Sequence, residues 1–465
     1  MLIKYLLLLG IIFSFNCEAQ TNPSKKIDQY VRQSWKSENG LPQNSITSIT
    51  QTPDGFIWLG SKEGLIRFDG VEFVKYDHNK IKQLKSNDIW TLKTDSKGVM
   101  WIGTNGGGLS YYSKGKFGNY SLKDGLADDG VWSVFEDSKG KLWIGTAGGG
   151  ISVLSNGKFR TINTNDGLSG NYIWTIIEDN KGAIWAGTDG NFVSRIKNDE
   201  IKIFDSSEGY TGDYTMAGLA DRNGNLWFGA AGIGLIKYDG GKFQIYQEGK
   251  DIPSNIIWSI IQDRKGNIWI GSDEGLTKYS NGVFDTYSET DGLPGGTVSS
   301  IYEDSEGNIW VGTKGGGISK FTDSEITTFT TKEGLSHNNV YSVYADYNDN
   351  LWICTSKGLN KYKDREFFST YKKLGLNYDI VISVTRRKNG EIWLGTDGSG
   401  IFRFIDGKFI NYTKEDGLVS NTVWSIYEDS KGIVWIGADG GGLVKYENNS
   451  FQGIDNEKIK GEYIS

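Results

Sequence analysis

A tryptophan returns about every 42 residues along this 465-residue chain. Successive members of the series are 43, 42, 42, 42, 42, 41, 42, 41 and 42 residues apart. A period this regular predicts a repeat architecture in which each copy is one supersecondary unit. The ten positions, which we expect to be structural, are Trp58, Trp101, Trp143, Trp185, Trp227, Trp269, Trp310, Trp352, Trp393 and Trp435.

Each copy reads as four short antiparallel strands. Asp stands six residues before the Trp in eight copies, and Gly stands three residues before it in nine, which is typical of a tight hairpin turn. The run that follows, such as "IWIGT", is continuously apolar, so this strand is covered on both faces. A Gly-rich turn and two further strands complete the copy. We therefore predict an all-β fold, a β-propeller of ten four-stranded blades of about 42 residues.

The segment "GLPQNSITSITQTPDGFIWLGSKEGLIRFDGVEF" and its nine relatives resemble the two-component regulator propeller repeat. The resemblance covers roughly residues 29 to 454. It implies the exported sensor portion of a hybrid two-component system, built from paired seven-bladed rings and often sensing products of polysaccharide breakdown. Family members usually continue into a further β-domain, a membrane helix and a kinase, which this sequence lacks.

The segment "YVRQSWKSENGL" aligns with the fourth strand and following loop of a repeat, with Trp35 at the position of Tyr120. We expect this strand to complete the Trp310 blade. The expected domains are a first propeller over residues 20–323 and a partial second propeller over 324–465. One ten-bladed ring is the alternative, although propellers usually have four to eight blades.

The N-terminus reads as a signal peptide over residues 1–19, because Lys4 precedes an apolar run and small residues precede Gln20. We therefore expect an exported, periplasmic protein without a membrane span after cleavage. Acylation of Cys17 is the alternative. The last residues align with the start of an eleventh repeat, so we expect a fragment of a longer sensor kinase or a tail that pairs with an existing blade.

Fourteen residues before the Trp, nine copies carry Asn or Asp. Such a row would ring the mouth of a propeller channel and bond sugar hydroxyls or a cation. Local turn chemistry is the alternative, since Asn and Asp readily bond nearby backbone. These ligand candidates are Asn44, Asn87, Asp129, Asn171, Asp213, Asn255, Asn338, Asp379 and Asn421.

Two further positions vary between copies, as ligand-reading positions would. Four residues after the Trp stand Lys62, Asn105, Ala147, Asp189, Ala231, Asp273, Lys314, Ser356, Asp397 and Asp439. The first strand carries an aromatic residue in several copies, and its rings would stack on sugars or pack between blades. The tryptophan candidates there are Trp90, Trp132, Trp174, Trp258 and Trp424.

No catalytic residue, metal ligand set or cofactor motif stands out. The two histidines, His78 and His337, lie outside the repeated motifs and beside no expected nucleophile. Cys354 takes a position that is Gly in the other nine copies, so we expect it to be buried. The formal charge of −7 without a basic block argues against nucleic acid as a partner.

The sequence therefore favours an exported sensor that binds an oligosaccharide or another small solute and reports it to a membrane sensor kinase. An enzyme, either a propeller lyase or a glycoside hydrolase, is the second hypothesis. A scaffold that binds another protein is the third. Scarce histidine and the family resemblance favour the sensor over the enzyme.

Overall fold

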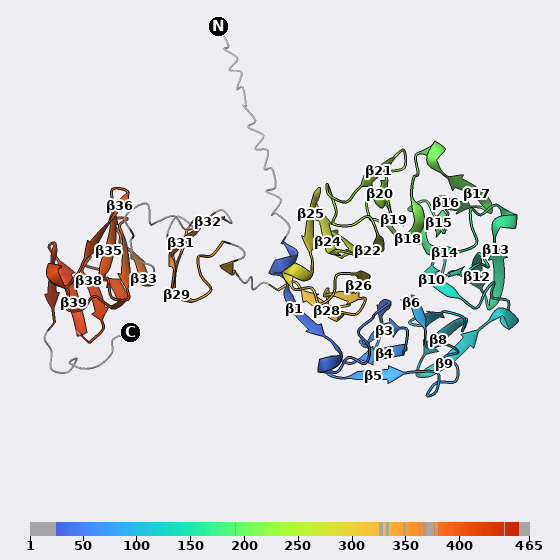
Figure 1. Cartoon of the computed structure of the whole chain (residues 1–465), viewed down its shortest axis with the longest axis horizontal. Helices are drawn as coiled ribbons and strands as arrows, with labels where there is room; N and C mark the ends of the chain where they lie inside the picture. Colours follow the sequence, from blue (N-terminus) through green and yellow to red (C-terminus); the bar gives the residue numbers. More distant parts are fainter. Residues whose placement is uncertain are drawn as a thin grey trace, which may run out of the picture. The chain divides into compact units, whose positions relative to one another are not determined.

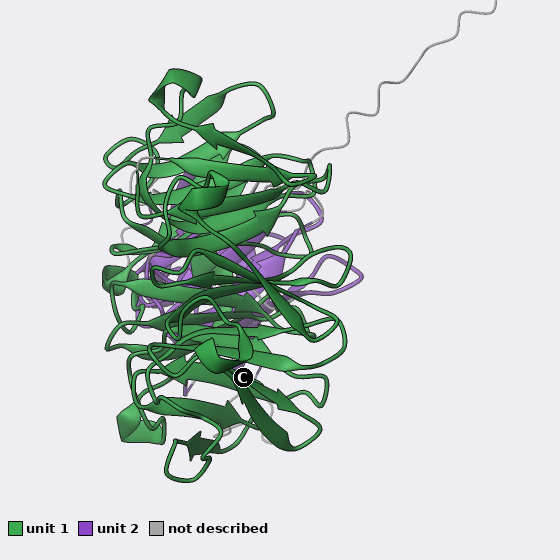
Figure 2. Ribbon diagram, turned by 90° about the vertical axis from the view of Figure 1, so that its right-hand side faces the viewer, with its two compact units in different colours: residues 1–325 green, residues 326–465 purple. Residues whose placement is uncertain are grey.

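The computed structural model describes residues 25–190, 192–324, 329–331, 334–346, 350–363, 366–368, 376, 380–440 and 442–454. The expected signal peptide, Cys17 and the expected eleventh repeat lie outside these residues. Within them, no helix is both long and apolar enough to cross a membrane. The chain divides into unit 1, residues 1–325, and unit 2, residues 326–465 (Figure 2).

Unit 1 contains seven four-stranded antiparallel sheets, which confirm the predicted blades and are numbered here from blade 1. Blades 1 to 3 are β2 (Ser48–Gln51), β3 (Ile57–Ser61), β4 (Gly64–Phe68) and β5 (Phe73–Tyr76); β6 (Ile89–Thr94), β7 (Met100–Thr104), β8 (Leu109–Ser113) and β9 (Lys116–Tyr120); and β10 (Val131–Glu136), β11 (Leu142–Thr146), β12 (Ile151–Ser155) and β13 (Lys158–Ile162). Blades 4 and 5 are β14 (Ile173–Glu178), β15 (Ile184–Thr188), β16 (Val193–Lys197) and β17 (Glu200–Phe204); and β18 (Asp213–Ala220), β19 (Leu226–Ala231), β20 (Gly234–Tyr238) and β21 (Phe243–Tyr246). Blades 6 and 7 are β22 (Ile257–Gln262), β23 (Ile268–Ser272), β24 (Gly275–Ser280) and β25 (Val283–Tyr287); and β26 (Val298–Glu303), β27 (Ile309–Thr313), β28 (Gly317–Thr322) and β1 (Val31–Trp35).

Unit 2 contains three more four-stranded antiparallel sheets, one for each of the last three repeats. They are β29 (Val340–Ala345), β30 (Leu351–Thr355), β31 (Gly358–Lys363) and β32 (Glu366–Phe368); β33 (Val381–Arg386), β34 (Ile392–Thr396), β35 (Ile401–Ile405) and β36 (Lys408–Tyr412); and β37 (Val423–Glu428), β38 (Val434–Ala438), β39 (Gly442–Glu447) and β40 (Ser450–Gly453). That these sheets are part of a second ring stays a prediction.

The innermost strands of unit 1 form a circle (Figure 1). Each one lies against the innermost strand of the next blade, and β26 of blade 7 lies against β2 of blade 1. The chain closes this circle with its own first strand, because β1 pairs with β28 and places Trp35 opposite Ile318. Two remote parts of the sequence therefore complete one blade.

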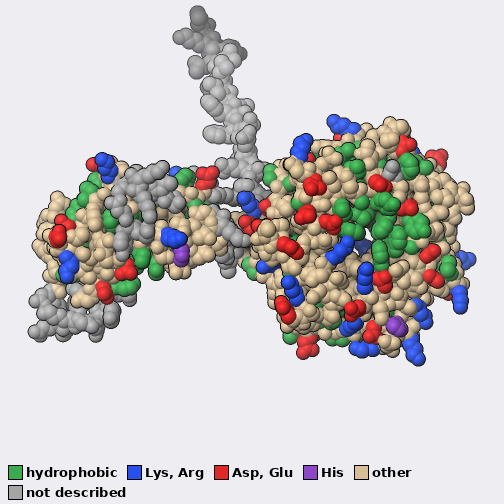
Figure 3. Space-filling view, viewed as in Figure 1, with side chains coloured by type: hydrophobic (Ala, Val, Ile, Leu, Met, Phe, Trp, Pro, Cys, Tyr) green, Lys and Arg blue, Asp and Glu red, His purple; other side chains and the backbone are tan. Residues whose placement is uncertain are grey.

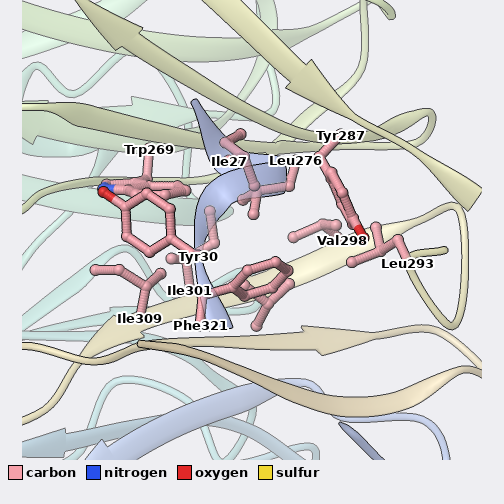
Figure 4. Close-up of a cluster of buried hydrophobic side chains, with 11 residues drawn as sticks. Ile27, Tyr30, Trp269, Leu276, Tyr287, Leu293, Val298, Ile301, Ile309 and Phe321 are labelled. Atoms are coloured by element: carbon pink, nitrogen blue, oxygen red, sulfur yellow. The ribbon is translucent and has the colours of Figure 1, made fainter. Parts of the chain in front are cut away.

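The closing segment is packed as well as hydrogen-bonded. Ile27, 1 % exposed, and Tyr30 lie among Trp269, Leu276 and Phe321 in one buried cluster (Figure 4). The Tyr30 ring meets the Trp269 ring edge-on, with 5.5 Å between centroids. Burying these apolar side chains stabilises the closure far more than strand pairing alone.

The repeated Asp, Gly and Trp form one structural device. In blade 3, Asp137 Oδ1 accepts hydrogen bonds from the backbone N–H groups of Lys139 and Lys141, at 3.0 and 2.8 Å. Gly140 takes a φ of 74°, which suits glycine at the end of this turn. The sequence predicted this turn correctly, but it missed that Asp137 Oδ2 also accepts the indole N–H of Trp143.

A second repeated device joins neighbouring blades. The backbone N–H and the hydroxyl of Ser96 donate to the two carboxylate oxygens of Glu136 in the next blade, both over 2.7 Å. Ser138 donates in the same way to Glu178. The repeated segment "EDSKG" therefore supplies both the Glu acceptor and the Ser donor of a hydrogen-bonded contact between neighbouring blades.

In unit 1 a glycine stands where neighbouring blades approach closely. A Cβ on Gly145 would lie 2.3 Å from the hydroxyl oxygen of Ser133 and 2.8 Å from the carbonyl oxygen of Ile173 in the next blade. Cys354 takes this position in unit 2 and is fully buried, as the sequence predicted. Burial raises the pKa of its thiol to about 12, which leaves it uncharged and unreactive at neutral pH.

Candidate functional site at the channel mouth of unit 1

The inner aromatic position is a β-bulge in every repeat except the first, where the register of β2 is unbroken. In β6, β10, β14 and β22 the pairing register with the second strand skips one residue, which is Trp90, Trp132, Trp174 and Trp258 respectively. A bulged residue has no direct partner, and its side chain is re-aimed relative to the strand. Ser299 takes the same position in blade 7. The bulges therefore determine which side chains face the central channel.

Three of these indoles come from consecutive blades and pack together. Trp90 stacks on Trp132 with 5.4 Å between ring centroids, and Trp132 lies 4.3 Å from Trp174. Tyr172, which is 44 % exposed, adds a fourth ring at 5.6 Å from Trp132. We call these four residues the aromatic wall. The three tryptophans are only partly buried, so the wall presents apolar surface to the channel.

The aromatic wall carries unused hydrogen-bonding groups. The indole nitrogens of Trp90, Trp132 and Trp174 are buried and bond to no described residue. Asp88 lies two residues before Trp90, and its buried carboxylate oxygen Oδ1 also bonds to no described residue. Its other oxygen, Oδ2, accepts a hydrogen bond from the Asn105 side chain over 3.0 Å. A buried polar group without a partner costs about 1–3 kcal/mol. The inner-strand serines Ser259, Ser300, Ser342 and Ser383 are in the same condition, so such groups are not confined to the wall.

The side of the channel formed by blades 6, 7 and 1 carries polar and charged side chains. The Trp258 indole donates to Asp273 over 2.6 Å, and the Lys314 ammonium lies 3.3 Å from the centroid of its ring. In blades 7 and 1 the inner positions hold Ser299 and Thr47, whose hydroxyls donate to backbone carbonyl oxygens of the neighbouring blade. The channel therefore has one aromatic side and one polar side.

Figure 3 shows one face of unit 1 on which the same contrast is visible. Hydrophobic side chains gather on one side of a central hollow, and Lys and Arg side chains lie across from them.

The predicted row of Asn and Asp residues is engaged in local structure. The Oδ1 atoms accept backbone N–H groups seven or nine residues earlier, over 2.8–2.9 Å, in Asn44, Asn87, Asp129, Asn171, Asn255, Asn338 and Asn421. Asp213 lies at the start of β18 opposite Ala231, and Asp379 lies outside the described residues. A ligand role for this row stays a prediction, and its amide and carboxylate oxygens already have partners in seven copies.

Backbone atoms of the same row link the blades. The carbonyl oxygen of Asn171, in the loop before β14, accepts the N–H groups of Gly148 and Gly150 over 3.2 and 2.9 Å. These glycines form the Gly-rich turn of blade 3, so each such contact fixes the loop of one blade on the turn of the previous one. The triple glycines are hairpin turns, as predicted.

In unit 2 the structure corrects one sequence prediction. His337 does lie beside a hydroxyl, because its Nδ1 is 2.7 Å from Ser356 Oγ. The same Nδ1 also accepts the backbone N–H of Asn339 over 3.0 Å. Ser86 and Ser254 accept the equivalent N–H groups in blades 2 and 6, so His337 replaces a turn acceptor.

The remaining predicted aromatic residue, Trp424, is the bulged residue of β37 in unit 2. It is 41 % exposed, and no aromatic wall like that of unit 1 surrounds it among the described residues. No group of three or more His, Cys, Asp or Glu in the described part of the chain is placed to hold a metal ion.

The sequence did not single out Asp88 or Tyr172. Both lie two residues before a candidate tryptophan, in the loop that leads into the inner strand. Side chains two residues apart in an extended segment share a face. Their spacing from Trp90 and Trp174 could therefore have identified Asp88 and Tyr172 from the sequence.

Seven blades around one channel, six of them with the same Asp–Trp turn, define a β-propeller protein of the repeat type. A family model for the two component regulator propeller matches eight segments, residues 40–63, 83–106, 125–148, 167–190, 251–274, 292–315, 334–357 and 417–440. The chain therefore belongs to the two component regulator propeller family. No curated protein sequence matches this chain.

Solved structures share the fold at low sequence identity. The extracellular domain of the putative hybrid two component system BT3049 from B. thetaiotaomicron is 22 % identical, with a TM-score of 0.59 over 93 % of this chain and 74 % of that one. The extracellular domain of BT4673 from the same organism is 21 % identical, with a TM-score of 0.52 over 94 % and 68 %. Virginiamycin B lyase from Staphylococcus aureus is 17 % identical, with a TM-score of 0.51 over 63 % and 99 %.

Proposed function

We propose that this chain is the exported sensor part of a two-component type signalling system and that it binds an oligosaccharide at the aromatic wall of unit 1. The observation that carries this proposal is the cluster of partly exposed aromatic rings from three consecutive blades. Sugar hydroxyls both donate and accept hydrogen bonds, so Tyr172, which is 44 % exposed, can bond a sugar hydroxyl there. The apolar face of a sugar ring stacks on indole rings in the same pose.

The signalling role is inferred from the family. The similar structures from B. thetaiotaomicron are extracellular domains of putative two component systems. We infer from this that the chain acts outside the cytoplasm, in the periplasm, and that its partner is a membrane sensor kinase. The proposed domain limits are residues 20–323 for the ligand-binding propeller and 324–465 for a partial second propeller.

Binding is proposed rather than catalysis because the similar extracellular domains belong to putative two component systems. Asp88 belongs to blade 2 and Asp273 to blade 6, and one oxygen of each accepts a hydrogen bond, from Asn105 and from the Trp258 indole respectively. These two acids therefore do not form a pair of free carboxylates side by side, as glycoside hydrolysis requires. One solved form of the lyase with the same fold is a histidine-to-alanine variant described as catalytically inactive. In this chain the described histidine of unit 1, His78, is an exposed loop residue, and it lies in no repeated motif.

A glycan-fragment panel screened by thermal unfolding tests the proposal. A ligand present at 100 times its Kd adds about 2.7 kcal/mol to the free energy of unfolding. At least one fragment is expected to raise the unfolding temperature of the wild-type chain. Consumption of the fragment during the assay would favour the enzyme instead, and no shift across the panel would count against a sugar ligand.

Two alanine variants locate the site. Trp132→Ala removes the central ring of the aromatic wall and is expected to abolish the ligand-induced shift. Trp424→Ala removes the tryptophan at the same repeat position in unit 2 and is expected to leave the shift unchanged. Equal responses of the two variants would contradict the assignment of the site to unit 1.

A further inference from the structure

Two lysines lie on adjacent blades at the same repeat position. Lys62 follows β3 of blade 1 and Lys314 follows β27 of blade 7, each four residues after the repeated tryptophan. The seven positions of unit 1 read Lys, Asn, Ala, Asp, Ala, Asp, Lys around the circle, from blade 1 to blade 7. Because blade 7 adjoins blade 1, the two cations are neighbours, while the two acids, Asp189 and Asp273, are separated by a blade.

Neither lysine is neutralised by a contact partner. No described carboxylate lies within 4.0 Å of the Lys62 or the Lys314 ammonium, whereas Lys75 and Lys202 each form a close ion pair. Asp273, the nearest acid in the circle, accepts the indole N–H of Trp258. The polar side of the channel therefore carries two lysines without a close ion pair among the described residues, with one carboxylate, Asp273, near Lys314.

The position of Lys314 is fixed by its surroundings. Its ammonium lies 3.3 Å from the Trp258 ring centroid, and its backbone N–H donates to the carbonyl oxygen of Thr297 over 3.0 Å. Partial burial lowers the pKa of Lys314, and the charge of Lys62 lowers it further, while Asp273 opposes both. An anionic group that reaches both ammonium groups gains a charge-assisted hydrogen bond from each.

We propose that the ligand of unit 1 carries an anionic group, such as a carboxylate, that binds between Lys62 and Lys314 while its ring lies on the aromatic wall. The proposal rests on the sugar-binding function above and narrows it to acidic sugars. The apolar and hydroxyl-bonding groups lie in blades 2 to 4, and the charge-bonding groups lie in blades 7 and 1, so one ligand across the mouth uses both sides.

A matched pair of probes isolates the charge. The probes 4-nitrophenyl β-D-glucuronide and 4-nitrophenyl β-D-glucoside differ only in a carboxylate that replaces a hydroxymethyl group. Binding is followed by quenching of tryptophan fluorescence in the full chain. We expect the glucuronide to bind about tenfold more tightly in 50 mM NaCl, and this advantage to shrink in 0.5 M NaCl as salt screens the contact.

Charge-removing variants assign the contact. Lys314→Gln and Lys62→Gln are expected to weaken glucuronide binding about tenfold and to leave glucoside binding unchanged. The control is Lys202→Gln, which removes a lysine of β17 that pairs with Glu208 over 2.9 Å, and it is expected to change neither affinity. The unfolding temperature of each variant, measured without probe, checks that the fold is kept.

Three outcomes would overturn the inference. If the two probes bound with equal affinity and Trp132→Ala abolished the binding of both, the sugar site would be supported and the preference for an anionic ligand would be contradicted. An equal loss of both probes in Lys314→Gln would give this lysine a packing role on Trp258. Failure of the wild-type chain to bind either probe would contradict both this inference and a sugar site on the aromatic wall.

Discussion

Asp137 and Trp143 are joined by a hydrogen bond in which the indole N–H donates to Oδ2 over 2.9 Å. Both side chains are buried, at 8 % exposure each. Every repeat makes an equivalent bond, and the acceptor is a different residue in only two of them. In the first repeat Thr52 accepts from Trp58, and in the ninth Glu391 accepts from Trp393. The device therefore secures both a hairpin turn and a buried tryptophan.

Asp137→Ala is expected to destabilise the protein by about 2–3 kcal/mol, because it leaves the Trp143 indole N–H buried without a partner and also removes two turn bonds. The turn alone would give about 0.5–1.5 kcal/mol. Trp143→Ala is expected to cost about 3–5 kcal/mol, since it opens a cavity between blades. Urea unfolding of the two single variants and of the double variant measures the coupling. Additive losses would contradict the direct contact.

Trp35→Ala is expected to weaken the closure of unit 1 by about 3–5 kcal/mol. The Trp35 ring stacks on Trp310 with 5.6 Å between centroids and meets Phe68 at 5.2 Å, so one side chain joins blade 7 to blade 1. Hydrogen exchange should show faster exchange in β1, β28 and β2 than in blades 3 and 4. Trp424→Ala is the control, and equal effects on unit 1 would argue against this closure.

Asn171→Ala is expected to cost about 1 kcal/mol of stability without changing ligand affinity. Its Oδ1 accepts the backbone N–H of Thr164 over 2.9 Å, and its Nδ2 donates to the Thr164 hydroxyl. Asn171→Asp keeps the first of these bonds and should recover most of the loss. If Asn171→Ala kept normal stability but lost ligand binding, the result would indicate that the Asn and Asp row contacts the ligand.

Glu391→Gln is expected to destabilise unit 2 at pH 7 and to matter less in acid. Burial raises the pKa of Glu391, but hydrogen bonds from Arg403 and Trp393 outweigh it and hold the pKa below its usual 4.5. A lowered folded-state pKa contributes stability that is present above pH 4.5 and is lost as pH falls through the folded value. Urea unfolding at pH 7 and pH 3 should show the gap between wild type and variant closing. A constant gap would contradict this role.

The site was only partly predictable. Trp90, Trp132 and Trp174 were recognised because the residue type at their repeat position varies between copies. The same criterion also selected Trp258 and Trp424, which lie in different surroundings. Trp258 bonds Asp273 and is covered by Lys314, and neither contact follows from the spacing of the repeats. A repeat alignment compares positions along the chain, whereas a ligand meets side chains from several blades at once.

The sequence alone determined the number of blades, the turn chemistry and the burial of eight of the ten repeated tryptophans. These features are local, since a 42-residue copy contains its own strands, its Asp turn and its Trp. Only the tertiary structure decided that three indoles meet on one side of the channel, and that Lys62 and Lys314 stand on adjoining blades although 252 residues separate them. Closure of the circle brings the first and last blades together, so the chemistry of the mouth depends on contacts that no single repeat contains.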